Sequence, residues 1–237
     1  MQILQSSQPA FRYLWKFGPK PPAYLAATRV VVFDLQNDEF FARCDDSLGR
    51  IGNPDKAGGI QLREMSNPWM AEANRLIQGA IDSAQLAPFK LMGDYDPQLA
   101  LALDTVSYHH DMPWWSAVLG AWCVKGPERV LHFPLMDLFV PFKPGVLVLF
   151  DPAQPHALLR PGQNSFTESE VALTDTEAEE RIAFVSFMAG KEGSLSTLLD
   201  ARQYDPEQHA HLRHTTPQYK ACRITGAVQF EDQPVPA

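Results

Sequence analysis

Between residues 100 and 190 the sequence is a succession of short apolar runs, each ended by glycine or proline. The runs are rich in valine, leucine and phenylalanine, which favour strands, and they read SAVLGAWCV, ERVLHFPL, DLFVPF, GVLVLF and RIAFVSFM. Turn-forming pairs separate them, as at Gly126-Pro127 and Pro144-Gly145. Runs of this length and spacing are typical of an antiparallel sandwich or barrel. The sequence therefore predicts a mainly β core over this stretch.

The first half of the chain predicts a strand, a loop and a helix. Residues 29–35 (RVVVFDL) are β-branched and read as a strand, and the glycines and proline that follow predict a loop (Gly49, Gly52, Pro54, Gly58 and Gly59). Asn67 is a good N-cap and Pro68 suits the first helical position. Behind them, apolar residues recur at helical spacing (Trp69, Ala73, Leu76, Ile77, Ala80 and Ile81). We expect an amphipathic helix over 68–85 that packs on a sheet.

The chain of 237 residues is expected to form a single domain, since β-rich folds often reach this length without splitting. Its β core spans about 100–190. The region 25–90 would pack on that core, and residues 191–237 would form a C-terminal extension that begins with a short helix in SLSTLLDARQ. The acidic stretch 161–180 predicts an exposed loop, and a lid over the site is the alternative.

Composition narrows the function classes. A net charge of −8 argues against a broad basic face for nucleic acid. The three cysteines, Cys44, Cys123 and Cys222, are widely spaced and form no CxxC motif, which fits a reducing compartment. The N-terminal segment lacks a signal-peptide core, and no window approaches the ~18 apolar residues of a spanning helix. We expect a cytoplasmic protein without a membrane segment that acts on a small-molecule substrate.

Three side chains within the β region can form one metal site. His109 and Asp111 end a strand-like run, and their separation of two residues places them on the same side of an extended chain. His156 follows the strand and turn GVLVLFDPAQPH, from which it can reach the same point. Two imidazoles and one carboxylate occupy one face of an octahedral ion and leave three positions open, as in non-heme Fe(II) oxygenases.

Other histidines are weaker ligand candidates. His110 does not share a strand face with Asp111, so the pair His110-Asp111 is more readily a supporting or surface pair. His132 lies within a predicted strand and is expected to be a hydrogen-bonded residue of the sheet. The tail histidines His209, His211 and His214 share no face in any one conformation, and no metal site follows from them.

The stretch from HHDMPWWSAVLGAW through PGVLVLFDPAQPHALL to RIAFVSF resembles the Fe(II)/2-oxoglutarate-dependent dioxygenases. The likeness covers about residues 100–190. It implies a double-stranded β-helix, a jelly-roll and cupin-like core with flanking helices. It also implies that His109, Asp111 and His156 bind iron, with 2-oxoglutarate as co-substrate and O₂ as oxidant.

In that family an arginine at the head of the last core strand binds the far carboxylate of 2-oxoglutarate, which the resemblance assigns to Arg181. A planar guanidinium suits this bidentate role. Two departures weaken the assignment. Ala183 stands where the family often has Ser or Thr, and the gap between His156 and the arginine is wider than usual. Arg160 is therefore the alternative anchor.

The implied activity is hydroxylation or another oxidation of a small molecule or an amino-acid side chain, coupled to conversion of 2-oxoglutarate to succinate. Asp111 favours hydroxylation, because the halogenating branch of the family replaces this carboxylate with a small residue. Two alternatives remain at this level: a cupin-like metal enzyme that does not use 2-oxoglutarate, and a non-catalytic β-helix binding module.

Overall fold

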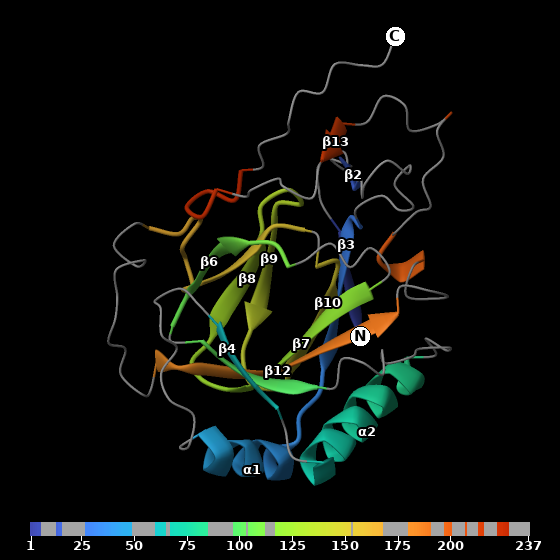
Figure 1. Ribbon diagram of the computed structural model, residues 1–237, viewed down its shortest axis with the longest axis vertical. Helices are drawn as coiled ribbons and strands as arrows, with labels where there is room; N and C mark the ends of the chain where they lie inside the picture. Colours follow the sequence, from blue (N-terminus) through green and yellow to red (C-terminus); the bar gives the residue numbers. More distant parts are fainter. Residues whose placement is uncertain are drawn as a thin grey trace.

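The structure is a computed structural model in which two antiparallel sheets pack face to face and two helices cover one of them (Figure 1). It describes residues 1–5, 13–15, 27–48, 60–64, 67–84, 97–102, 104–111, 117–152, 154–167, 180–190, 197–200, 207, 213–215 and 222–227. The glycine-rich loop at 49–59, most of the acidic stretch, and His209 and His211 lie outside these residues. Neither of the described helices is long and apolar enough to span a membrane.

The larger sheet has seven strands. In spatial order they are β1 (Gln2–Gln5), β3 (Arg29–Asp34), β10 (Val146–Phe150), β7 (Ala117–Lys125), β12 (Ile182–Gly190), β5 (Gln98–Ala102) and β4 (Ile60–Glu64). The smaller sheet contains β6 (Val106–His109), β11 (His156–Leu159), β8 (Arg129–Phe133) and β9 (Leu138–Phe142). A separate parallel pair joins β2 (Tyr13–Trp15) to β13 (Arg213–Thr215).

The eight strands from β5 to β12 wind between the two sheets. Strands β5, β7, β10 and β12 belong to the larger sheet, and β6, β8, β9 and β11 to the smaller one. All the pairings among them are antiparallel. This winding is that of a jelly roll, or double-stranded β-helix, so the predicted fold class is confirmed.

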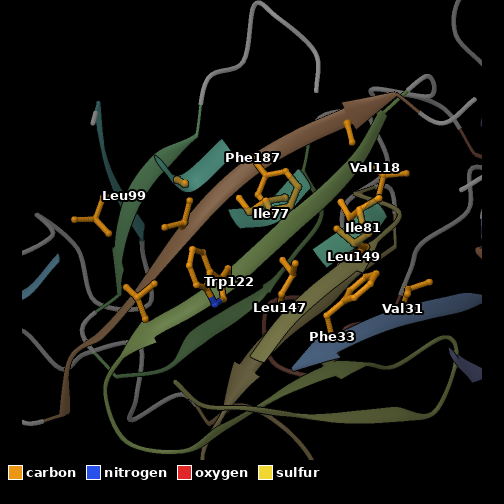
Figure 2. Packing of buried hydrophobic residues seen from close by; sticks show 14 of the residues in the cluster. Val31, Phe33, Ile77, Ile81, Leu99, Val118, Trp122, Leu147, Leu149 and Phe187 are labelled. Atoms are coloured by element: carbon orange, nitrogen blue, oxygen red, sulfur yellow. The ribbon is translucent and has the colours of Figure 1, made fainter. Parts of the chain in front are cut away.

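The central strands of the larger sheet bury both faces, so the sheet separates two apolar cores. In β10, Val148 and Phe150 join the core between the sheets, whereas Leu147 and Leu149 join the core beneath the helices. Figure 2 shows the second core, in which Ile77 and Ile81 lie against Trp122 and Leu149. The helix predicted over 68–85 is confirmed as α2 (Asn67–Ser83), and its apolar stripe packs on the sheet as expected.

A helix that the sequence analysis did not predict, α1 (Asp38–Leu48), follows β3. Its N-cap is Asn37, whose side-chain oxygen accepts the backbone N–H of Phe40 at 2.9 Å. The Phe40 ring stacks on Trp122 with centroids 4.9 Å apart. The helix is short and mostly polar (DEFFARCDDSL). Its stability therefore comes more from tertiary packing on Trp122 than from an apolar stripe that its sequence would reveal.

A buried ion network lies where β5 leads into β6 and where β8 begins. Asp104 is 2% exposed and accepts hydrogen bonds from Arg129 at 2.6 and 2.9 Å. Its other carboxylate oxygen accepts the Arg160 Nε–H at 3.0 Å. Glu180 also pairs with Arg129, from a side chain that is 49% exposed. One buried carboxylate thus binds two guanidinium groups, and Glu180 supplies the second negative charge of the network.

Replacing Asp104 with Asn should lower the free energy of unfolding by about 3–5 kcal/mol, because it removes the buried counter-charge of Arg129 and leaves only the exposed Glu180. Urea denaturation measures this loss. The control is Glu180→Gln, which removes an exposed partner of the same arginine and should cost no more than about 1 kcal/mol. Equal losses in the two variants would contradict a central role for Asp104.

Candidate metal centre and its cavity

The smaller sheet brings the two predicted histidine ligands together. His109 is the last residue of β6, His156 is the first residue of β11, and the antiparallel pairing sets them opposite each other. Asp111 follows two residues after His109. Its backbone N–H donates to Pro152 O at 3.0 Å, which ties the segment after β6 to the turn before β11. His109 and Asp111, which are close in sequence, and His156 from the neighbouring strand thereby converge on one point.

The potential ligand atoms of His109, Asp111 and His156 all lie within 4.8 Å of one another. Asp111 Oδ2 is 3.5 Å from His156 Nε2, and Asp111 Oδ1 is 3.9 Å from His109 Nε2. The two imidazole rings are tilted, with centroids 4.3 Å apart. The three side chains therefore point into a common space that is the size of a metal site.

Backbone carbonyls fix which nitrogen of each imidazole faces that space. His109 Nδ1 lies 2.8 Å from Ser107 O, and His156 Nδ1 lies 2.9 Å from Gln154 O. A carbonyl oxygen can only accept, so each Nδ1 carries the proton and each neutral ring leaves Nε2 free as a donor to metal. Orientation of a ligating histidine through its second nitrogen is the usual arrangement in metal proteins.

The triad has a buried side and an exposed side. His156 is 5% exposed and lies among rings, with the Phe150 centroid 4.7 Å from its own. Burial, assisted by the nearby His109, lowers the pKa of His156 to about 4, although Asp111 acts in the opposite direction. The side chains of His109 and Asp111 are 31% and 35% exposed. At neutral pH His156 is therefore the neutral imidazole that a metal requires.

The turn before His156 is held by contacts that its sequence does not reveal. Asp151 is buried, and its Oδ2 accepts the Ala27 N–H at 2.9 Å. Gln154 donates its Nε2–H to Ala27 O at 2.5 Å, and its backbone N–H bonds to Asp151 O. The segment before β3 is thus clamped to the carbonyl that orients His156. No pattern in the sequence links residue 27 to residues 151–154.

A cavity of about 310 Å³ opens beside the triad, between the two sheets. All three triad residues line it, together with Ser186. The rest of its described wall is apolar and is drawn from seven strands: Val106, Leu119, Ala121, Leu131, Phe142, Phe150, Leu158, Phe184 and Met188. Ligand cavities start at about this volume.

Neither predicted anchor for 2-oxoglutarate is among the residues that line the cavity. Arg160 binds Asp104. Arg181 immediately precedes β12, and its Nε is buried without a hydrogen-bond partner among the described residues. Ile182 belongs to the core between the sheets and Ala183 to the core beneath the helices, so strand alternation assigns Arg181 to the helix side. The anchoring role stays a prediction for both arginines.

The other histidines of the β region lie outside the triad. His132 is confirmed as a hydrogen-bonded residue of the sheet: its Nδ1 bonds to the Tyr108 hydroxyl, and its ring stacks on Phe139 at 4.0 Å. His110 Nδ1 lies 3.2 Å from Asp111 O. Among the described residues, the one group of three or more side chains that could hold a metal ion is the predicted triad.

Comparison with solved structures finds similar folds at low sequence identity. The chain is similar to the viral collagen prolyl hydroxylase of Paramecium bursaria Chlorella virus 1, solved as a 2-oxoglutarate complex, at 13% identity and a TM-score of 0.46, covering 68% of this chain and 94% of that one. A Pseudomonas putida prolyl-4-hydroxylase is similar at 14% identity and a TM-score of 0.42, covering 69% of this chain and 93% of that one. HygX of Streptomyces hygroscopicus, solved with nickel and 2-oxoglutarate bound, is similar at 12% identity and a TM-score of 0.42, covering 68% of this chain and 82% of that one.

No protein-family model matches the chain, and no curated protein sequence matches it significantly. Structural likenesses at this identity and TM-score assign no activity. The residues of the site itself are therefore the basis for a function.

His156→Ala should weaken Fe(II) binding by more than about 100-fold, because even the partners that orient a ligand are worth about 10–100-fold in affinity. His110→Gln is the matched control, since it changes the adjacent histidine that lies outside the triad, and it should retain affinity. Anaerobic calorimetric titration with Fe(II) compares the two. Equal affinity in the His156 variant and the native protein would remove His156 from the ligand set.

Acidification should destabilise metal-free protein through His156. Its pKa is about 4 in the folded state and about 6.5 when unfolded, so the unfolded state takes up the proton first as pH falls from 6.5 to 4. Between pH 7 and pH 5 the free energy of unfolding should fall by about 2 kcal/mol more in the native protein than in His156→Gln. Urea denaturation with a chelator present measures this. If the free energy of unfolding depended on pH in the same way in both proteins, the lowered pKa of His156 would be contradicted.

Proposed function

We propose that this protein is a non-heme Fe(II) oxygenase that uses a 2-oxo acid as co-substrate and oxidises a small molecule or an amino-acid side chain. The observation that carries the proposal is the triad: His109, Asp111 and His156 converge to within 4.8 Å, and both imidazoles present Nε2 to the common space. The triad also borders a cavity between the sheets.

The donor set fits Fe(II). Two neutral imidazoles and one carboxylate suit this ion, and three protein ligands leave coordination positions open. A site closed by four protein ligands would serve a structural metal instead. When bound, iron would supply positions at which an oxo acid and O₂ can react.

The chain's own residues have separate tasks in this scheme. Asp111 supplies the one negative charge of the triad, and its backbone bond to Pro152 fixes the segment that carries it. His156 and the rings of Phe150 and Phe133 keep water from the buried side. The exposed edges of His109 and Asp111 leave the other side open to a substrate.

The proposed reaction balances without a further reductant. The 2-oxo acid loses its carboxylate carbon as CO₂ and becomes a carboxylic acid one carbon shorter, which gives up two electrons. The substrate C–H bond becomes C–OH and gives up two more. These four electrons reduce O₂, with one oxygen atom entering the new acid and one entering the alcohol.

2-Oxoglutarate, the co-substrate that the family resemblance implies, fits this cavity incompletely. Its 2-oxo acid end suits the triad, but beyond the triad the described wall offers its far carboxylate only apolar side chains and Ser186. Burial of a carboxylate among apolar side chains is strongly unfavourable unless a cation pairs with it. The reaction above is therefore written for a 2-oxo acid in general.

Asp111→Ala should abolish O₂ consumption that depends on a 2-oxo acid, with a fall of more than about 100-fold, because the metal loses its one anionic ligand. The variant should stay folded, since the Asp111 side chain is 35% exposed. An oxygen electrode measures the rate, and circular dichroism checks the fold. Asp34→Ala, at an exposed position at the end of β3, is the control. Full activity in the Asp111 variant would refute the proposed function.

A further inference from the structure

The body of the cavity is a hydrocarbon surface formed by both sheets. From the smaller sheet come Leu131 and Phe142, and from the larger sheet comes Phe184. The rings of Phe142 and Phe184 meet edge to face, with centroids 5.9 Å apart. Apart from the triad, Ser186 is the polar lining residue in the described part of the chain. Such a wall is complementary to an apolar ligand.

All three triad residues line the cavity between the sheets, but they differ in exposure. His156 is buried, whereas His109 and Asp111 are each about one-third exposed. A substrate can arrive from the exposed side. The group that extends from the metal into the cavity body then belongs to the oxo acid.

The buried cation of β8 is already neutralised. Arg129 shares its face of the strand with Leu131 and Phe133, which both belong to the core between the sheets. Its guanidinium donates to Asp104 at 2.6 and 2.9 Å and also pairs with Glu180. Arg160 binds the second oxygen of Asp104. A dicarboxylate would have to compete with Asp104 for either group.

We infer that the co-substrate of this oxygenase is a 2-oxo acid with an apolar side chain, which the cavity binds more tightly than 2-oxoglutarate. The inference rests on the proposed function and specifies its co-substrate. The 2-oxo acid end meets the triad, and the aliphatic or aromatic body lies among Leu131, Phe142 and Phe184. The product is the apolar carboxylic acid one carbon shorter, released with CO₂ as balanced above.

The test is an anaerobic titration of the Fe(II)-loaded protein with four probes: 4-methyl-2-oxopentanoate, phenylpyruvate, pyruvate and 2-oxoglutarate. The visible iron-to-oxo-acid charge-transfer band reports binding directly, without turnover. One of the two apolar probes should bind at least about tenfold more tightly than 2-oxoglutarate, since burial of two methylene-sized groups is worth that much. Pyruvate should bind more weakly than the better apolar probe.

Two phenylalanines on opposite faces of β12 give a matched pair of variants. Phe184→Ala enlarges the cavity and should raise the affinity for phenylpyruvate relative to 4-methyl-2-oxopentanoate by about tenfold. Phe187→Ala removes the same ring from the face beneath the helices and should leave that ratio unchanged. Unchanged ratios in both variants, or equal changes, would show that the oxo acid does not occupy the apolar body.

The outcomes separate the inference from the proposed function. If 2-oxoglutarate binds most tightly, and Arg181→Ala removes that preference, then Arg181 reaches the cavity; the inference is overturned while the oxygenase proposal stands. If iron binds and no oxo acid produces the band, the proposed function fails and the inference fails with it.

Discussion

The antiparallel pairing of β6 with β11 is the interaction on which the site depends. It sets His109 opposite His156, and residue-by-residue alternation then brings Asp111 to the same side. The register also places Ser107 O and Gln154 O where each can accept an Nδ1–H. A slip of one residue would turn every side chain of a strand to the other face, so ligand geometry and fold share one determinant.

The surroundings of the triad preserve that register. Beyond β11, Arg160 reaches Asp104, which also holds Arg129 at the start of β8. Before β11, Asp151 and Gln154 hold the chain at Ala27. Strand β11 is thus fixed at both ends, by an ion network on one side and a hydrogen-bonded clamp on the other. The cavity beside the triad is lined mainly by apolar side chains. Polar contacts therefore position strand β11, and apolar side chains shape the cavity.

Much of the fold could be predicted because its local signals agree. The run of short strands, the N-cap at Asn67 and the helical stripe of α2 each depend on neighbouring residues alone. Helix α1 was missed because its stability comes from the contact of Phe40 with Trp122, far along the chain. The clamp on Ala27 was missed for the same reason, since it joins residues more than 120 positions apart.

The sequence by itself identified the candidate metal triad: the His-x-Asp spacing matches the strand period, and His156 follows a recognisable strand and turn. Only the tertiary structure decided what faces the triad across the cavity. Strand β12 buries apolar residues on both faces, so its pattern carries no alternation that would identify the cavity side. The packing of β12 between β7 and β5 decides which of its residues face the cavity. It turns Phe184, Ser186 and Met188 toward the cavity, whereas Arg181, directly before the strand, is not among the lining residues.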